Sequence, residues 1–189
     1  GEFDSSRYLK ASMYCLNSAE NGDILLGTSE NYIYRVKLSD GNYSEGSFEF
    51  TEYDTGGIST FNWVEEAPDG NIWAAAQNGL GYADAQRGWH TVNSEHTASS
   101  RTVCFDYEGN VWAASSSYGV IHIVDSLYCN PNCAAGISDD FINTVAVGDD
   151  CCYLGTDVGI IILNKDFEPV TNELVTMLEG ERIRNISID

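Results

Sequence analysis

The sequence predicts an all-β protein, a β-propeller fragment of about four blades with four antiparallel strands each, plus one extra C-terminal strand. Three observations carry this prediction. A hairpin-like segment recurs four times at intervals of about 40 residues, which is the length of a propeller blade. The 18 Gly recur at strand and turn positions, against only 3 Pro. Helical periodicity is missing except at residues 173–180, which suit a helical turn or two.

The four repeats share one order of residue types. They comprise residues 21–28, 69–76, 108–115 and 149–156. In each repeat a polar turn precedes a large apolar residue, which small residues follow. The large residues are Leu25, Trp73, Trp112 and Tyr153. Because a residue that recurs in every blade belongs to the repeated packing, we expect these four to form the core between blades rather than a ligand site.

Turn residues divide each repeat into strands. The step Asp69-Gly70-Asn71 predicts a tight hairpin, because Gly and Asn adopt positive φ at little cost. A second turn then leads into a third strand, at Asn31, Gly79, Gly119 and Gly159. A β-sandwich also contains many short strands, but it does not predict the same hairpin four times.

The blades are expected at roughly residues 8–54, 58–94, 100–130 and 140–178, within a propeller segment that covers residues 4–189. Residues 1–3 read Gly-Glu-Phe, which a common cloning site encodes, and are interpreted as a vector remnant. Residues 181–189 look like the opening strand of a fifth blade. Four blades with such a strand leave unpaired edges, which predicts self-association of the chain.

The charge of the chain restricts its partners. Twenty-nine Asp and Glu against nine Lys and Arg give a formal net charge of −20. Nucleic acid is therefore excluded as a partner, since no basic patch offsets phosphate repulsion. No apolar run is long enough to cross a bilayer, so no membrane insertion is expected of this segment. No cofactor-binding motif is present, and none of the acidic runs matches a calcium loop.

The six cysteines leave several possibilities open. Cys129 and Cys133 flank a turn-forming Asn-Pro-Asn, so a disulfide between them is favoured over free thiols or loose metal ligation. A zinc site needs a second pair of ligands. The adjacent Cys151 and Cys152 point to opposite faces of a strand, so no metal site is predicted.

The repeats resemble the two-component regulator propeller repeat, whose pattern is roughly Asp-x-x-Gly-Asn-Leu-Trp-Ile-Gly-Thr-x-x-Gly-Leu. The match is best at Asp69–Leu80 and Glu108–Val120 and partial at Asn21–Tyr32, where Leu25 stands in the Trp position. In the fourth repeat Asp150 takes the Gly position. A Gly-Ile-Ser-Asp-Asp stretch within residues 135–142 is similar to the linker of the family.

The resemblance implies a sensor. Its repeats form seven-bladed propellers outside the bacterial cytoplasmic membrane, in membrane-bound receptors with a signalling output, and many respond to carbohydrates. The chain is accordingly expected to be a non-catalytic, extracytoplasmic segment whose ligand is a small molecule or an oligosaccharide.

Ligand-binding residues should vary between blades and lie in loops. A propeller gathers its turns between second and third strands, together with its inter-blade loops, on one face. These loops contribute Tyr32, Gln77, Asn78, His96, Arg101, Tyr118 and Asp157 as candidate ligand-binding residues.

Two further functions remain open. One is a structural or oligomerisation segment without a small-molecule ligand. The other is an enzyme, for which propeller lyases and glycoside hydrolases are the natural comparisons. A hydrolase needs two opposed carboxylates, or a Tyr nucleophile with an Arg cluster. The scarcity of Arg argues against the cluster, and no motif marks a catalytic residue.

Overall fold

The computed structural model describes residues 11–38, 48–124, 127–129 and 142–188. They form four antiparallel sheets of four strands each. The first two sheets comprise β1 (Met13–Ser18), β2 (Ile24–Thr28), β3 (Tyr32–Leu38), β4 (Phe48–Asp54), β5 (Phe61–Glu66), β6 (Ile72–Ala76), β7 (Gly79–Ala83) and β8 (Trp89–Thr91). The other two comprise β9 (Ser100–Phe105), β10 (Val111–Ser115), β11 (Gly119–Val124), β12 (Leu127–Cys129), β13 (Ile142–Val147), β14 (Cys151–Thr156), β15 (Ile160–Asn164) and β16 (Pro169–Val170).

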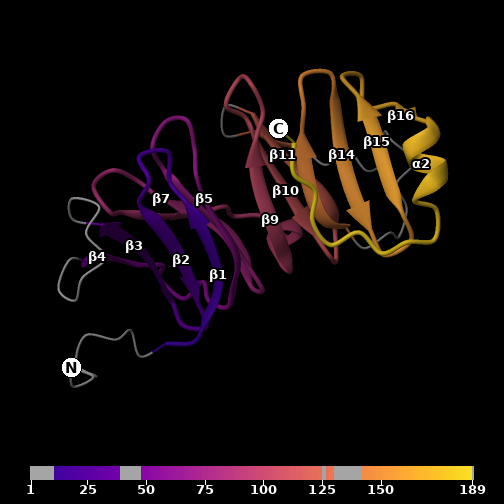
Figure 1. Cartoon of the computed structure of the whole chain (residues 1–189). Helices are drawn as coiled ribbons and strands as arrows, with labels where there is room; N and C mark the ends of the chain where they lie inside the picture. Colours follow the sequence, from indigo (N-terminus) through magenta and orange to yellow (C-terminus); the bar gives the residue numbers. More distant parts are fainter. Residues whose placement is uncertain (1–10, 39–47, 125–126, 130–141, 189) are drawn as a thin grey trace.

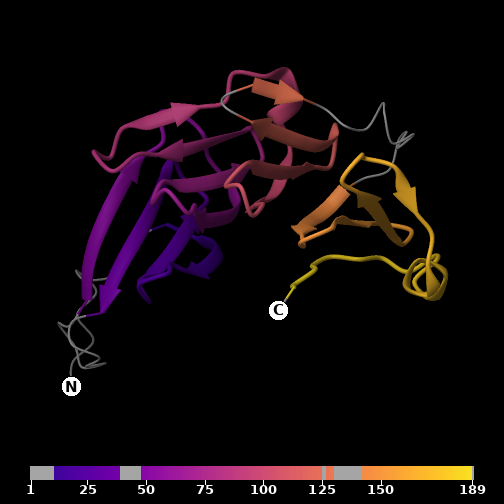
Figure 2. The same cartoon turned by 90° about the horizontal axis from the view of Figure 1, so that it is seen from above.

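The strands of each sheet follow chain order, so every sheet is an up-and-down blade. The blades succeed one another along an arc, as Figures 1 and 2 show. Their first strands face one another, because β1 packs on β5, β5 on β9 and β9 on β13. These first strands therefore line the axis of the arc. The all-β architecture of four four-stranded blades is confirmed. The short helix expected near the C-terminal end is α2 (Glu173–Met177).

The same turn closes the first hairpin of three blades. Gly22, Gly70 and Gly109 have φ values of 86°, 82° and 84°. Each donates its amide to the carbonyl three residues earlier, at 2.8–3.0 Å. The fourth hairpin departs from this pattern. There Gly148 donates to the carbonyl of Cys151 at 2.9 Å, and Val147 pairs directly with Cys152. The loop is shorter, so Asp150 does not take the role of the turn glycine.

Apolar layers between consecutive blades form the core. Leu25 packs toward the second blade, Trp73 toward the third and Trp112 toward the fourth. In β6 and β10 a small residue follows on the opposite face, Ala74 and Ala113, each at 0% exposure. These three large residues lie in the apolar layers between blades.

The expectation that Tyr153 forms the core between blades needs a correction. Cys152 and Leu154 point into the layer shared with the third blade, so Tyr153 points to the outward face of the fourth blade. It is only half-buried there. No complete blade packs on that face in the described residues, which is why the repeat position is not fully enclosed.

The last residues occupy the position of a fifth inner strand. Asn62 donates its side-chain amide to the carbonyl of Ser100, the first residue of the next inner strand, at 2.7 Å. Asn143 donates in the same way to the carbonyl of Ile183 at 3.1 Å. The Ile183 side chain lies against Gly155. The fit is tight, because a Cβ added at Gly155 would lie only 2.7 Å from Ile183 Cγ2.

The expected extra strand therefore needs a correction. Residues 181–188 follow the path of the next blade's first strand, but they have no strand hydrogen-bonding pattern. Among the described residues, no second strand pairs with them. Ile183 is anchored instead by its amide, which donates to the carbonyl of Thr156 at 2.8 Å.

The disulfide prediction for Cys129 and Cys133 lies outside the described side chains. Among the described cysteines, Cys15, Cys104, Cys151 and Cys152 are free thiols. In the described part of the chain, no helix is both long and apolar enough to cross a membrane.

Candidate ligand-binding groove

One β-bulge recurs near the start of every inner strand. The residue skipped by the ladder is Tyr14 in β1, Asn62 in β5, Arg101 in β9 and Asn143 in β13. A bulge bends its strand and redirects a side chain, and bulges are frequent at the rims of barrels and next to binding sites. Arg184 follows Ile183 as Asn62 follows Phe61, so it takes the equivalent place in the fifth inner strand. In the second, third and fourth blades this position thus sets one polar side chain at the same end of the axis.

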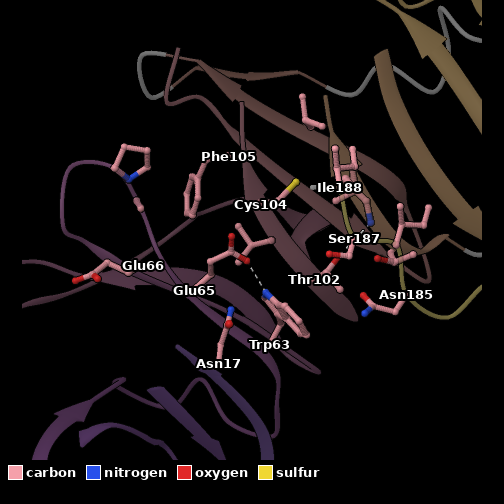
Figure 3. A pocket seen from close by; sticks show the side chains of 18 of the residues that line it. Asn17, Trp63, Glu65, Glu66, Thr102, Cys104, Phe105, Asn185, Ser187 and Ile188 are labelled. Atoms are coloured by element: carbon pink, nitrogen blue, oxygen red, sulfur yellow. Dashed lines mark hydrogen bonds between the residues drawn. The ribbon is translucent and has the colours of Figure 1, made fainter. Parts of the chain in front are cut away.

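A groove of about 650 Å³ runs along the axis. Its walls come from β5, β9 and β13, with contributions from the end of β1 and from the C-terminal residues 185–188. Figure 3 shows side chains of these segments around it. The groove therefore joins residues that lie more than one hundred positions apart in the sequence.

The wall from β5 carries an aromatic residue and a half-buried carboxyl. Trp63 donates its indole Nε1–H to Glu65 at 2.7 Å. Burial raises the pKa of Glu65, and the hydrogen bond from Trp63 opposes that rise. Figure 3 shows the carboxyl between the indole and the thiol of Cys104. Burial, with a further contribution from the nearby Glu65 charge, raises the pKa of Cys104 well above its ordinary value, so this thiol is unreactive.

The next carboxyl along β5 has a structural role. Glu66 accepts a hydrogen bond from Arg35 Nη1 at 2.7 Å, and Arg35 Nε binds Asp23 at 2.7 Å. Glu66 also accepts from the amide of Glu20 at 3.0 Å. These contacts fasten the first blade to the second and fix one end of the groove.

At the opposite end, the groove opens into a recess rich in nitrogen donors. Three side chains, Trp63, Thr102 and Asn185, line both the groove and the recess. The recess is lined by Asn62, Trp63, Arg101, Thr102, Asn143, Arg182, Arg184 and Asn185. Three of the chain's few Arg thus meet here. The expectation that the chain lacks an Arg cluster is wrong, because Arg101 and the two C-terminal Arg are remote in sequence but adjacent across the axis.

The structure brings two of the sequence-predicted ligand residues to this recess. Arg101 lines it. Asp157 accepts from Asn143 Nδ2 at 2.8 Å and pairs with Arg182 Nε at 2.8 Å. Asp157 thus positions lining residues rather than facing the recess itself.

The other predicted ligand residues lie elsewhere on the loops. His96 stands in a short 3-10 turn, edge-on to the ring of Tyr118 at 5.2 Å. Asn78 binds the inter-blade loop through the amide of Ser59 and the carbonyl of Gly57, at 2.9 Å each. The side chain of Gln77 is exposed, and Tyr32 begins β3 opposite Asp54. None of these residues lines the groove or the recess described above.

Sequence reasoning missed Trp63, Glu65, Asn143 and Arg184. The signal was nevertheless present, because Asn62, Arg101, Asn143 and Arg184 recur about 40 residues apart at one repeat position. The aromatic residues of the repeat are conspicuous in the second strands, whereas the first strands make the groove.

Within the described residues, no group of three or more His, Cys, Asp or Glu side chains is placed to hold a metal ion.

Solved structures with the same arrangement of blades exist. The extracellular domain of a protein assigned as the hybrid two-component system BT3049 of B. thetaiotaomicron matches 94% of this chain with a TM-score of 0.68 and 17% identity. The WD40 domain of Neurospora crassa Pan2 matches 87% with a TM-score of 0.58 and 10% identity. The fold is that of a β-propeller. The extracellular domain of a second such system, BT4673, matches 84% with a TM-score of 0.52 and 12% identity.

The chain spans about a quarter of the length of the two B. thetaiotaomicron domains and half of the Pan2 domain. No protein-family model matches the sequence, and no curated protein matches it. The identities are low, so the likeness of this propeller to its structural neighbours concerns the fold.

Proposed function

We propose that this chain is a non-catalytic, ligand-sensing segment of an extracytoplasmic receptor in bacterial signal transduction. In this proposal a small molecule or an oligosaccharide binds in the axial groove. Two of the structural neighbours are extracellular domains of proteins assigned as two-component systems, which supports the sensing role.

The observation that carries the proposal is the groove. Its volume of about 650 Å³ falls within the roughly 300 to 1,000 Å³ of small-molecule sites. The wall offers an aromatic face at Trp63 and polar groups at Thr102 and Asn185. Aromatic faces with a few convergent polar groups suit a sugar ring, whose faces are apolar and whose edges bear hydroxyls.

The carboxyl groups of the groove support binding over hydrolysis. Hydrolysis of a glycosidic bond needs two opposed carboxyls that act as a pair. Glu65 and Glu66 are neighbours on β5, so they point to opposite faces of the strand. Glu66 is already bound by Arg35. Glu65 already accepts the indole N–H of Trp63 at 2.7 Å.

A sensor needs a ligand that distinguishes two arrangements of the protein. Residues 185–188 form one wall of the groove, and Ile183 anchors the segment through one backbone hydrogen bond and the Asn143 side chain. A ligand that contacts both this segment and β5 or β9 would favour the docked segment. In the proposal, docking of this segment is the conformational change by which ligand binding in the groove is signalled.

A thermal-shift panel of neutral and acidic oligosaccharides tests the proposal. Asn185→Trp fills the space where the groove meets the recess at an exposed position, and Tyr118→Ala removes the rim aromatic outside the groove. We expect a ligand that raises Tm in the wild type and in Tyr118→Ala, but not in Asn185→Trp. A ligand-induced rise in Tm that is lost in Tyr118→Ala but kept in Asn185→Trp would place the binding site on the loop rim. It would refute binding in the groove.

A structural or oligomerisation role is the second candidate, and one observation favours it. The face of the first blade that points away from the second blade carries Tyr14 at 60% exposure and Leu16 at 65%. Such an apolar sheet face is typical of a surface that another protein element covers.

A further inference from the structure

The recess at the end of the groove has an unusual charge for this chain. The protein carries a formal net charge of −20 with only nine Lys and Arg. Three of these cations line one recess, with three Asn side chains beside them. Like charges that converge on one point repel each other, so this arrangement carries an electrostatic cost. Charges that served only solubility could be spread over the surface without that cost.

Among the described residues, two of the three guanidinium groups have no acidic partner. Arg182 is paired with Asp157 at 2.8 Å. By contrast, Arg101 and Arg184 form no ion pair with any residue that the structure describes. The Nε of Arg101 is buried and has no hydrogen-bond partner among the described residues. A buried Nε–H without a partner calls for an explanation, since buried polar groups are nearly always satisfied.

The position of these groups follows from the repeat. Asn62, Arg101 and Asn143 stand at the bulge site of three successive inner strands, and Arg184 takes the equivalent place in the C-terminal segment. The bulge directs each side chain to the same end of the axis. The side-chain amides of Asn62 and Asn143 also bind the next inner strand, which sets the spacing between neighbouring members. Three of the four donors are therefore placed by the backbone of the inner strands, and the fourth by the docked C-terminal segment.

We infer that the recess binds an anionic group, a carboxylate or a sulfate ester, carried by the ligand of the groove. Arg101 and Arg184 supply the charge and the forked N–H donors that suit such oxygens. Asn185 and Thr102, shared by recess and groove, connect the anionic end of the ligand to its remainder. The inference rests on the proposed function and names the ligand class of the same site, an acidic saccharide or a similar acid.

Inorganic sulfate tests the anion site alone. In ¹H–¹⁵N spectra of the whole chain, titration with sulfate at constant ionic strength should shift the Arg101 and Arg184 Nε–H signals along a saturating curve. Arg184→Gln changes an exposed residue and should weaken sulfate binding roughly tenfold or more, as expected for the loss of a charge-assisted hydrogen bond. Lys165→Gln is the matched control, because it removes one positive charge outside the recess, where Lys165 pairs with Asp150 at 3.0 Å. It should leave sulfate binding unchanged.

A galacturonate trimer and a neutral galactose trimer then test the ligand class. We expect the acidic trimer to bind more tightly, with the difference removed in Arg184→Gln and retained in Lys165→Gln. Sulfate esters of the galactose trimer form a third arm, which distinguishes a carboxylate from a sulfate. Arg101→Lys, which keeps the charge but removes the fork, should weaken binding of the acidic trimer.

The outcomes separate the two proposals. Sulfate shifts that remain linear, or that are equal in Arg184→Gln and Lys165→Gln, would overturn the anion site. If the neutral trimer moves the Trp63 indole signal as strongly as the acidic one in every variant, the groove is a ligand site but the anionic specificity is wrong. If saturable sulfate binding is confirmed but neither trimer moves the Trp63 signal, the anion site holds and the saccharide reading of the groove fails.

Discussion

At the scale of single residues, the groove contains a carboxyl whose environment opposes ionisation. Glu65 is enclosed beside Cys104 and accepts one hydrogen bond from Trp63. Because burial raises its pKa, the neutral acid is favoured in the folded protein relative to the unfolded chain. The stability that Glu65 contributes is therefore fully present below the unfolded pKa of about 4.3, and it is lost as pH rises through the folded value.

Glu65→Gln should remove this pH dependence. The amide keeps an oxygen for the Trp63 indole but cannot ionise. Urea denaturation measures the free energy of unfolding of both proteins. We expect the value of the variant minus that of the wild type to be larger at pH 7 than at pH 4, so that the variant gains stability relative to wild type as pH rises. Glu108→Gln, which removes an exposed carboxyl, corrects for the change in net charge. An unfolding difference for Glu65→Gln that is identical at the two pH values would show that the carboxyl is not buried at a cost.

At the scale of elements, the three equivalent hairpin glycines isolate a backbone effect. Gly70 has a φ of 82°, and a Cβ placed on it would meet nothing within 4 Å. Gly70→Ala should therefore lower the free energy of unfolding by about 1 to 2 kcal/mol through backbone conformation alone. Gly70→Asn should lower it less, because Asn tolerates positive φ. Equal losses for Ala and Asn, measured by urea denaturation, would contradict this account of the turn.

The side-chain amide of Asn143 holds the C-terminal segment through the carbonyl of Ile183. Asn143→Ala removes the donor to the Ile183 carbonyl, so hydrogen exchange at the Ile183 amide should become faster, while β5 and β9 keep their protection. Asn62→Ala is the matched control, because it removes the equivalent bond between the second and third blades. If both variants left exchange at Ile183 unchanged, residues 183–188 would not be docked as a fifth inner strand.

Some features of these elements could be predicted from the sequence, and others could not. The blade count, the strand positions and the core roles of Leu25, Trp73 and Trp112 could be predicted, because they depend on a local pattern repeated four times. The role of Tyr153 could not, since its burial depends on whether another blade follows. The Arg recess could not either. It joins Arg101 to residues about 80 positions away through the curvature of the arc, which no local pattern encodes.

At the scale of the whole molecule, the two ends of the arc differ. The outward face of the fourth blade is covered by α2 and the C-terminal segment, so Ile160 and Ile162 are buried at 7% and 2% exposure. The outward face of the first blade exposes Tyr14, Leu16 and Phe50. Self-association, which the unpaired edges predict from sequence, should therefore use the first-blade face rather than the fourth.

Leu16→Glu tests this asymmetry by light scattering. The substitution places a charge on the exposed apolar face, so we expect a wild-type dimer or larger assembly to dissociate into monomers. Leu174→Glu is the control at the other end, on the half-exposed surface of α2, and should leave the mass unchanged. A wild-type chain that is monomeric at high concentration would contradict the predicted self-association.

A crystal structure of the chain grown with the galacturonate trimer tests the central claim most directly. The account predicts the trimer along the axial groove, against Trp63 and Thr102, with one carboxylate on Arg101 and Arg184. It also predicts residues 183–188 in the position of a fifth inner strand. A trimer bound instead among the loops near His96 and Tyr118, or crystals whose groove stays empty at a saturating concentration, would contradict it.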